Sequence, residues 1–145
     1  MKKQDLRTEL LNSLSVLYDT DALAPLVKFL QGELRVLYYL YTHCDKVIYI
    51  SDLSEETMVS RSRVTALINA LKKKDYIRLE HCEHDRRRIS VHLTEKGASY
   101  TKEQQEVAFG YFDRLVDGFG EDNTAELIRL INLATEVMEN IDDKE

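Results

Sequence analysis

Several features are scarce in this sequence of 145 residues. It contains one proline, Pro25, and five glycines, so long regular segments are expected. No apolar run approaches the roughly 20 residues that a membrane-spanning helix needs. The chain starts basic over residues 1–5, but no apolar signal core follows. We therefore expect a cytoplasmic protein with no membrane partner.

Cysteine is also scarce, and the arrangement of the two residues excludes several functions. Cys44 and Cys82 lie 38 positions apart with no CxxC pair, so a disulfide is the weaker interpretation in a reducing compartment. The dipeptide 43–44 and residues 81–84 contain metal-ligand types in no established zinc spacing. In the alternative interpretation, His81 packs beneath a hairpin. We predict no metal site and no cofactor.

An enzyme is a weak alternative. Such an enzyme would use Cys82 or His84, but no residue at a recognisable spacing would act as base or orienting group. The sequence also contains no glycine-rich phosphate loop. Its 43% hydrophobic and 32% charged residues are typical of a globular chain. We predict a non-enzymatic domain with one compact core.

Charge is distributed unevenly. The net charge is −6, which taken alone disfavours nucleic acid. Residues 61–96, however, hold ten Lys or Arg and five Asp or Glu, a local charge of +5, so the remainder carries −11. A basic block in an acidic chain concentrates phosphate attraction on one face. The alternative is an ordinary solvated surface.

Apolar periodicity predicts helices at both ends of the chain. Residues 5–18 have leucines at helical spacing, a break follows at 19–25, and a strongly apolar helix is expected over 33–43. Near the other end, a helix capped by Thr94 is expected to reach about residue 117. Gly118 and Gly120 bracket a break, and a last helix is predicted over 124–141.

The centre of the chain predicts a strand, two helices and a hairpin. Residues 47–50 suit a short strand, and Ser51 is a candidate N-cap for a helix ending near Met58. Ser60 is a better N-cap for the next helix, which runs to about residue 74. That helix has a buried stripe of Val64, Leu67, Ile68 and Leu71.

The outward face of this helix is short and polar. Its residues are Ser62, Thr65, Ala66, Asn69 and Lys73, and Arg61 and Arg63 flank them near the N-cap Ser60. Short donors permit close approach to base edges, and a helix N-terminus favours a phosphate. An ordinary solvated face would carry long Glu and Lys side chains, which the first two turns lack. The pattern indicates a helix that enters a DNA major groove.

Two runs of period two, residues 77–82 and 89–93, flank a charged tip and predict a β-hairpin. The tip includes Asp85, Arg86, Arg87 and Arg88. At the end of a hairpin, arginines reach a minor groove, whose negative potential stabilises guanidinium groups. We expect Asp85 to orient one arginine through a charge-assisted hydrogen bond. The alternative is a solvated turn.

Residues 31–97 resemble the MarR/SlyA family of winged-helix regulators. The resemblance is carried by Val-Ser-Arg-Ser-Arg-Val-Thr at 59–65, the segment 67–71, Asp-Arg-Arg at 85–87 and Val-His-Leu-Thr-Glu-Lys-Gly at 91–97. It implies a recognition helix at 60–74, a minor-groove arginine at Arg87 and dimerisation through the terminal helices. The chain departs from the family pattern at Thr57, Met58, Ala66 and Arg88, which affects the turn geometry and the base contacts.

The predicted fold is mainly α with a small β-hairpin wing, a winged helix-turn-helix flanked by N- and C-terminal dimerisation helices. Region 1–30 and region 98–145 would dimerise, and region 31–97 would bind DNA. Much apolar surface on the terminal helices supports a two-fold interface. The expected interface residues are Leu6, Leu10, Leu14, Leu17, Leu127, Ile131, Ala134, Val137, Met138 and Ile141.

We therefore expect a homodimeric, sequence-specific regulator that binds a pseudo-palindromic site in double-stranded DNA. The resemblance implies a repressor released by a small-molecule or stress signal, and leaves open whether an effector exists. Four tyrosines (Tyr38, Tyr39, Tyr41 and Tyr49) would line an aromatic effector pocket or, in the alternative, are core aromatics. The alternative function is a winged helix that contacts only protein. Peroxide-sensing relatives use a cysteine in the first helix, which this chain lacks.

Overall fold

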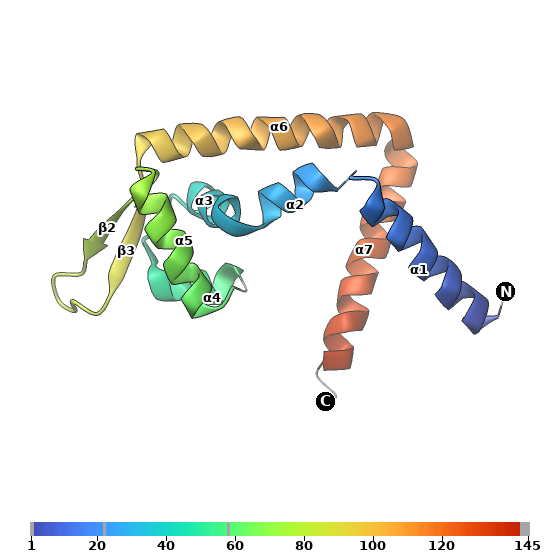
Figure 1. The fold of residues 1–145 in the computed structure, drawn as a ribbon, viewed down its shortest axis with the longest axis horizontal. Coiled ribbons are helices and arrows are strands. Elements are labelled where there is room, and N and C mark those ends of the chain that lie inside the picture. The colour runs from blue at the N-terminus through green and yellow to red at the C-terminus, as the bar shows by residue number, and fades with distance from the viewer. Residues whose placement is uncertain (1, 22, 58, 143–145) are drawn as a thin grey trace. The chain divides into compact units, whose positions relative to one another are not determined.

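The computed structural model describes residues 2–21, 23–57 and 59–142 (Figure 1). Within these ranges the chain forms seven helices and one small three-stranded antiparallel sheet. The predicted fold class, mainly α with a small wing, is confirmed. The chain divides into two compact units, Met1–Ala108 and Phe109–Glu145.

The first unit contains the winged helix. Its elements are α1 (Lys3–Asp19), α2 (Ala24–Leu30), α3 (Gly32–Thr42), β1 (Ile48–Tyr49), α4 (Ile50–Thr57), α5 (Arg61–Lys73), β2 (Ile77–His81), β3 (Ile89–Leu93) and the first half of α6 (Glu95–Phe119). The second unit contains the rest of α6 and α7 (Glu121–Asp142). Among the described helices, none combines the length and apolarity needed to cross a membrane.

Two predicted helix caps are confirmed. The Ser60 hydroxyl accepts a hydrogen bond from the Arg63 N–H at 3.4 Å, at the start of α5. The Thr94 hydroxyl accepts one from the Gly97 N–H at 3.0 Å, at the start of α6. Each side chain satisfies a backbone donor that has no partner inside its helix, which stabilises the helix by about 1 kcal/mol.

The predicted Ser51 cap is wrong. Helix α4 begins at Ile50, and Ser51 lies inside its first turn. The Asp52 carboxylate instead accepts a hydrogen bond from the Tyr49 N–H at 3.1 Å. The strand and the helix follow each other without a connecting residue, so the acidic side chain one position later is the group that reaches back. The predicted end of α4 at Met58 lies outside the described residues.

Two predicted breaks are also corrected. The break expected at 19–25 contains the start of α2, because Pro25 occupies the first turn, where its missing N–H costs nothing. Gly118 is part of α6, whose end is marked by Gly120 in the left-handed region at φ +80°. Helix α7 then begins at once, at Glu121 rather than at residue 124.

The core of the first unit joins α3, α4, α5 and the sheet. The side chains of Val36, Leu37, Leu53, Val64 and Leu71 are all no more than 1% exposed. The predicted stripe of α5 is confirmed: three of its four residues are buried, and Leu67 is half-buried against them. In the sheet, β3 lies between β1 and β2, so the hairpin is anchored to the helical core through its second strand.

The hairpin ends against the start of α6 at a tightly packed joint. A Cβ placed on Gly97 would come within 2.8 Å of the carbonyl carbon of Tyr76 and closer still to its oxygen. That oxygen accepts the Thr94 N–H at 3.1 Å. The rings of Tyr76 and Tyr100 stack with centroids 4.6 Å apart. The joint therefore holds the wing hairpin to the first turn of α6.

Candidate nucleic-acid interface

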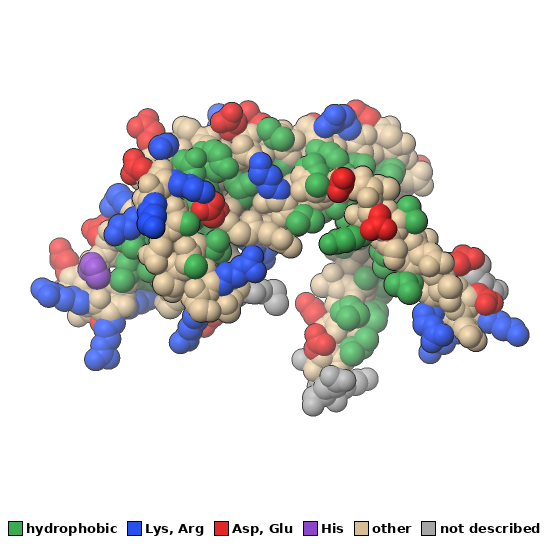
Figure 2. Space-filling model, in the orientation of Figure 1, with side chains coloured by type: hydrophobic (Ala, Val, Ile, Leu, Met, Phe, Trp, Pro, Cys, Tyr) green, Lys and Arg blue, Asp and Glu red, His purple; other side chains and the backbone are tan. Residues whose placement is uncertain are grey.

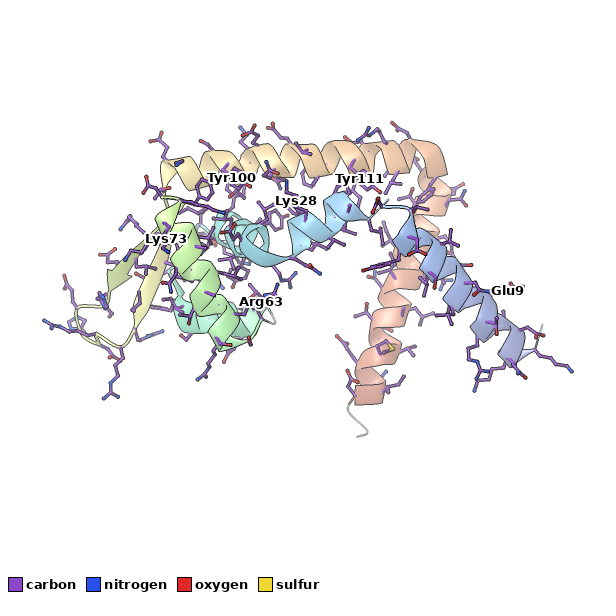
Figure 3. All side chains as sticks on the ribbon, viewed as in Figure 1. Glu9, Lys28, Arg63, Lys73, Tyr100 and Tyr111 are labelled. Carbon is purple, nitrogen blue, oxygen red and sulfur yellow. The ribbon has the colours of Figure 1, made fainter. Side chains whose placement is uncertain are left out.

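The outward face of α5 is the first part of the candidate interface. Its predicted residues, Ser62, Thr65, Ala66, Asn69 and Lys73, are all exposed, as are Arg61 and Arg63 at the N-terminal end. Figure 3 shows Arg63 and Lys73 at the two ends of this helix. Because the opposite stripe is buried in the core, the helix presents this short-chained polar face to solvent as a fixed surface.

The wing tip is the second part. The backbone closes the hairpin through hydrogen bonds from the Cys82 N–H to the Arg88 carbonyl and from the Arg88 N–H to the Asp85 carbonyl, both at 3.0 Å. His81 Nδ1 lies 3.2 Å from the carbonyl oxygen of Arg86. His81 is exposed, so the alternative that it packs beneath the hairpin is wrong. It braces the tip instead.

Asp85 acts on the wing through the backbone. Its carboxylate oxygen accepts the N–H of Arg87 at 3.0 Å, an arrangement in which an Asp side chain stabilises a turn two residues on. The prediction that Asp85 orients an arginine is corrected in this respect, since the bond reaches the main chain of Arg87 and not a guanidinium. The guanidinium of Arg87 is therefore left free for another partner.

Cations of the basic block fall into paired and unpaired groups. Lys74 forms an ion pair with Glu33 at 2.7 Å, and Arg78 forms one with Glu80 at 3.3 Å. The hydrogen bond to Glu33 raises the pKa of Lys74 above its ordinary value. Among the residues the structure describes, the other eight cations of the block have no such carboxylate partner: the lysines Lys72, Lys73 and Lys96, and the arginines Arg61, Arg63, Arg86, Arg87 and Arg88.

These five unpaired arginines lie on α5 and at the wing tip. Figure 2 shows Lys and Arg side chains gathered over this part of the first unit. Neighbouring like charges without counter-charges repel one another, and they are tolerated where an anionic partner compensates them. The arrangement is suited to binding phosphates along one face.

A cleft of about 340 Å³ separates the two parts of the interface. Its lining includes Arg61 from α5, Arg87 and Arg88 from the wing, and Ser51 from α4. The guanidinium carbon of Arg88 lies 3.8 Å from the centroid of the Tyr49 ring. Sequence reasoning missed this contact, because a tyrosine in a short strand has no local signal that pairs it with an arginine 39 positions later.

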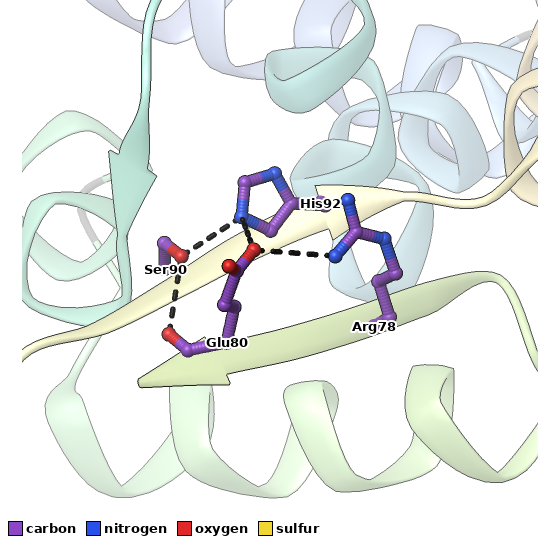
Figure 4. A network of polar contacts seen from close by, with 4 residues as sticks. All are labelled: Arg78, Glu80, Ser90 and His92. Atoms are coloured by element: carbon purple, nitrogen blue, oxygen red, sulfur yellow. Dashed lines mark hydrogen bonds and ion pairs between the residues drawn. The ribbon is translucent and has the colours of Figure 1, made fainter. Parts of the chain in front are cut away.

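The outer face of the sheet carries a polar network with a structural role (Figure 4). The Ser90 hydroxyl donates to the Glu80 carbonyl at 3.1 Å, and it lies 2.8 Å from His92 Nε2. The Glu80 carboxylate lies 3.5 Å from the same imidazole nitrogen and 3.3 Å from Arg78. These contacts join the two hairpin strands, and the Glu80 carboxylate compensates the charge of Arg78.

The cysteines and histidines do not form a cluster. Cys44 is exposed and Cys82 is half-buried, and both are free thiols. Within residues 2–21, 23–57 and 59–142, no three His, Cys, Asp or Glu side chains are placed to share a metal ion. His43 instead stacks on Tyr39, with ring centroids 4.2 Å apart.

The tyrosines that sequence analysis grouped have separate surroundings. Tyr38 and Tyr39 line a cavity of about 200 Å³ beside Arg35, and Tyr38 also packs edge-on against Phe29. Tyr49 contacts Arg88 elsewhere. A second cavity, of about 310 Å³, lies between α2, α3 and α6 and is lined by Phe29 and other apolar residues. The grouping as a single aromatic pocket therefore does not match the structure.

The predicted dimerisation residues are exposed. Helix α1 contains no buried residue, and its leucines at 6, 10, 14 and 17 are 44–62% exposed. Helix α7, in the second unit, likewise contains none, and Ile131, Val137, Met138 and Ile141 are 49–58% exposed. Figure 2 shows apolar side chains on the surface of both helices. Exposed apolar helix faces of this kind are typical of protein–protein interfaces.

Comparison with known sequences finds one matching family. Residues 29–88 match the MarR family. The Bacillus subtilis HTH-type transcriptional regulator YfiV is 35% identical over 63 residues, which are 43% of this chain and 38% of that protein. The HTH-type transcriptional repressor YetL of the same organism is 18% identical over 101 residues, or 70% of this chain and 60% of that protein. The chain thus spans about half the length of the curated relatives it matches.

Solved structures share the fold over nearly the whole chain. FabT of Streptococcus pneumoniae, crystallised in complex with DNA, superposes with a TM-score of 0.71 at 20% identity, covering 93% of this chain and 99% of that one. AbsC of Streptomyces coelicolor, a MarR family transcriptional regulator, superposes with a TM-score of 0.69 at 23% identity, covering 97% of each chain. At these identities the likeness establishes the fold.

Proposed function

Because residues 29–88 match the MarR family and the fold is that of winged-helix proteins, we propose that this chain is a MarR-family transcriptional regulator that binds double-stranded DNA through α5 and the wing tip. In this proposal α5 enters a major groove. The face that includes Ser62, Thr65, Ala66 and Asn69 meets base edges there. The wing tip places Arg87 in the adjacent minor groove.

The observation that carries the proposal is the separation of paired from unpaired cations. Two cations of the basic block have carboxylate partners: Lys74 pairs with Glu33, and Arg78 pairs with Glu80. The arginines of α5 and the tip have none among the described residues. A protein-contact winged helix would have no reason to keep five guanidinium groups uncompensated on one face. FabT, which has the same fold, was crystallised with DNA.

We also propose that two copies of the chain associate through regions 1–30 and 98–145, while region 31–97 binds DNA. The exposed apolar faces of α1 and α7 support this, since neither helix buries a residue within one chain. A two-fold dimer would present two copies of α5 to successive major grooves, about one DNA turn apart. The matching operator is a pseudo-palindrome.

Repression is the regulatory outcome we propose, supported by the similarity to the repressor YetL. Release from DNA would follow from an effector that stabilises a dimer whose two α5 helices no longer match the groove spacing. The cavity between α2, α3 and α6 is a candidate site for such a small molecule, because its walls are mostly apolar and include Phe29.

The test is a binding titration with the promoter region of the chain's own gene, measured by fluorescence anisotropy at several salt concentrations. Arg87→Ala is expected to weaken binding by about 5- to 150-fold for each wing in contact with DNA, the range found when one groove-contacting arginine is lost. Arg78→Ala is the matched control: it removes the same charge from the same hairpin, but from a residue already paired with Glu80.

Wild-type affinity is expected to fall steeply as salt rises, because bound protein displaces counterions from phosphates. The Arg78→Ala variant should bind like the wild type. Binding that is absent, or that does not change with salt, would contradict the proposed function. Equal losses in both variants would show that Arg87 has no special role.

A further inference from the structure

We propose that Tyr49 positions Arg88 as a phosphate-binding group, so that Arg88 and Arg61 hold the DNA strand that runs between the recognition helix and the wing. This inference rests on the proposed function and assigns a distinct role within it. Arg87 reads the minor groove at the tip. Arg88, at the base of the tip, contacts the backbone and is held for that purpose by an aromatic ring.

The Arg88 guanidinium lies over the ring of Tyr49. The Arg88 guanidinium carbon lies 3.8 Å from the ring centroid of Tyr49, which is a close cation–π distance. A guanidinium held over an aromatic ring in this way retains its N–H donors, whose fork matches the geometry of a phosphate. The contact thus fixes the side chain without consuming the hydrogen bonds that would bind an anion.

The main chains of both Tyr49 and Arg88 are anchored by hydrogen bonds. Tyr49 is half-buried, and its main chain pairs with Ser90 in the sheet and donates to Asp52 at 3.1 Å. The Arg88 main chain makes two hydrogen bonds that close the hairpin, to Cys82 and Asp85. Arg86 and Arg87, by contrast, form the turn itself. The main chains of Arg86 and Arg87 also make hydrogen bonds, but among these three arginines Arg88 is the one whose guanidinium lies over an aromatic ring.

The cleft of about 340 Å³ lies between α5 and the wing. The wall that includes Arg88 belongs to the wing, and the wall that includes Arg61 belongs to the N-terminal turn of α5. If α5 occupies a major groove and the wing tip occupies the adjacent minor groove, the sugar-phosphate backbone that divides these grooves must pass between them. That path crosses the cleft, whose lining includes Arg61 on one wall and Arg87 and Arg88 on the other.

Two hydroxyl groups in the cleft lining do not compete for this role. The Ser54 hydroxyl donates to the Val59 carbonyl at 2.9 Å, and the Thr65 hydroxyl donates to the Arg61 carbonyl at 3.0 Å. Their protons are already committed to the main chain. The arginines thus supply the strongest donors that a phosphate would meet in the cleft.

The test uses a mixed-sequence duplex, because a phosphate contact does not depend on the operator. Arg88→Gln is expected to reduce the slope of log K against log salt by about 1.8 for a dimer, or 0.9 for each lost phosphate contact. Tyr49→Leu is expected to weaken binding by about 5- to 30-fold for a dimer, since each arginine loses its stack. Tyr49→Phe keeps the ring and should bind like the wild type.

A double-mutant cycle separates positioning from a structural role. In the Arg88→Gln background, Tyr49→Leu should have no further effect, because the group it positions is gone. If Tyr49→Leu weakens binding equally in both backgrounds, or if Tyr49→Phe binds as weakly as Tyr49→Leu, the inference is wrong. An unchanged salt slope in Arg88→Gln would also overturn it. If the wild type itself shows no salt-dependent binding, the proposed function fails and this inference fails with it.

Discussion

Replacement of Gly97 by alanine tests the joint between the wing hairpin and α6. The added Cβ would lie 2.8 Å from the Tyr76 carbonyl carbon and 3.0 Å from its Cα, and closest to the carbonyl oxygen. These are backbone atoms, so no side-chain rotation relieves the overlap. The main chain of either α6 or the segment before β2 must move.

The magnitude follows from what such a movement breaks. Overpacking of this kind costs about 1–3 kcal/mol. The shift also strains the hydrogen bonds from Thr94 N–H to Tyr76 and from Gly97 N–H to Thr94, 3.1 and 3.0 Å long, each contributing about 1 kcal/mol. Alanine regains up to about 1 kcal/mol of helix propensity. We expect a net loss of roughly 2–4 kcal/mol in the free energy of unfolding.

The assay is urea denaturation followed by circular dichroism, at one fixed protomer concentration because dimer stability depends on concentration. Gly110→Ala is the matched control. Gly110 also lies inside α6, but a Cβ there meets nothing within 4 Å, so this variant should equal or exceed the wild type in stability. A Gly97→Ala variant as stable as Gly110→Ala would refute the reasoning.

Three further outcomes are expected. Ser60→Ala should lower the free energy of unfolding by about 0.5–2 kcal/mol in the same denaturation assay, because the Arg63 N–H loses its cap; an unchanged value would contradict the cap. Ile131→Glu should convert dimer to monomer in sedimentation velocity by placing a charge on the apolar face of α7, while the neighbouring Asn132→Glu serves as the control for added charge. Arg129 holds the pKa of Glu126 below its ordinary value of 4.5, so the pair stabilises the folded state above that pH and the contribution is lost as pH falls through the lowered pKa. Melting temperatures of wild type and Glu126→Gln should therefore differ near pH 7 and converge near pH 3, and a constant difference would show that the pair has no such role.

Features with short-range causes were predictable from the sequence alone. Apolar spacing located the buried stripe of α5, and the hydroxyl of Ser60 marked the start of that helix. Alternation at period two located the hairpin. In each case the determining interactions lie within a few residues of one another, so the local pattern contains the physical cause. The family resemblance over residues 31–97 depends on these same local patterns.

The tertiary structure decided which groups meet across the chain. At the start of α4 the side chain that accepts a backbone N–H is Asp52 and not the predicted cap Ser51. At the wing tip the Asp85 carboxylate accepts the backbone N–H of Arg87. The tertiary structure also separated the paired Lys74 from the unpaired arginines. The first two contacts join residues three and two positions apart, where several acceptors lie nearby and the folded backbone selects one. The Lys74–Glu33 pair joins residues 41 positions apart, and composition alone cannot indicate which cations are neutralised.

The same reason explains the stack of Arg88 on Tyr49 and the close approach of Gly97 to Tyr76. In both cases neither residue has a distinctive local pattern, and the contact exists only after strands and helices have packed. The sequence by itself therefore determined that a basic winged helix is present. Only the packed structure decided which of its arginines are free to bind and which is held in place.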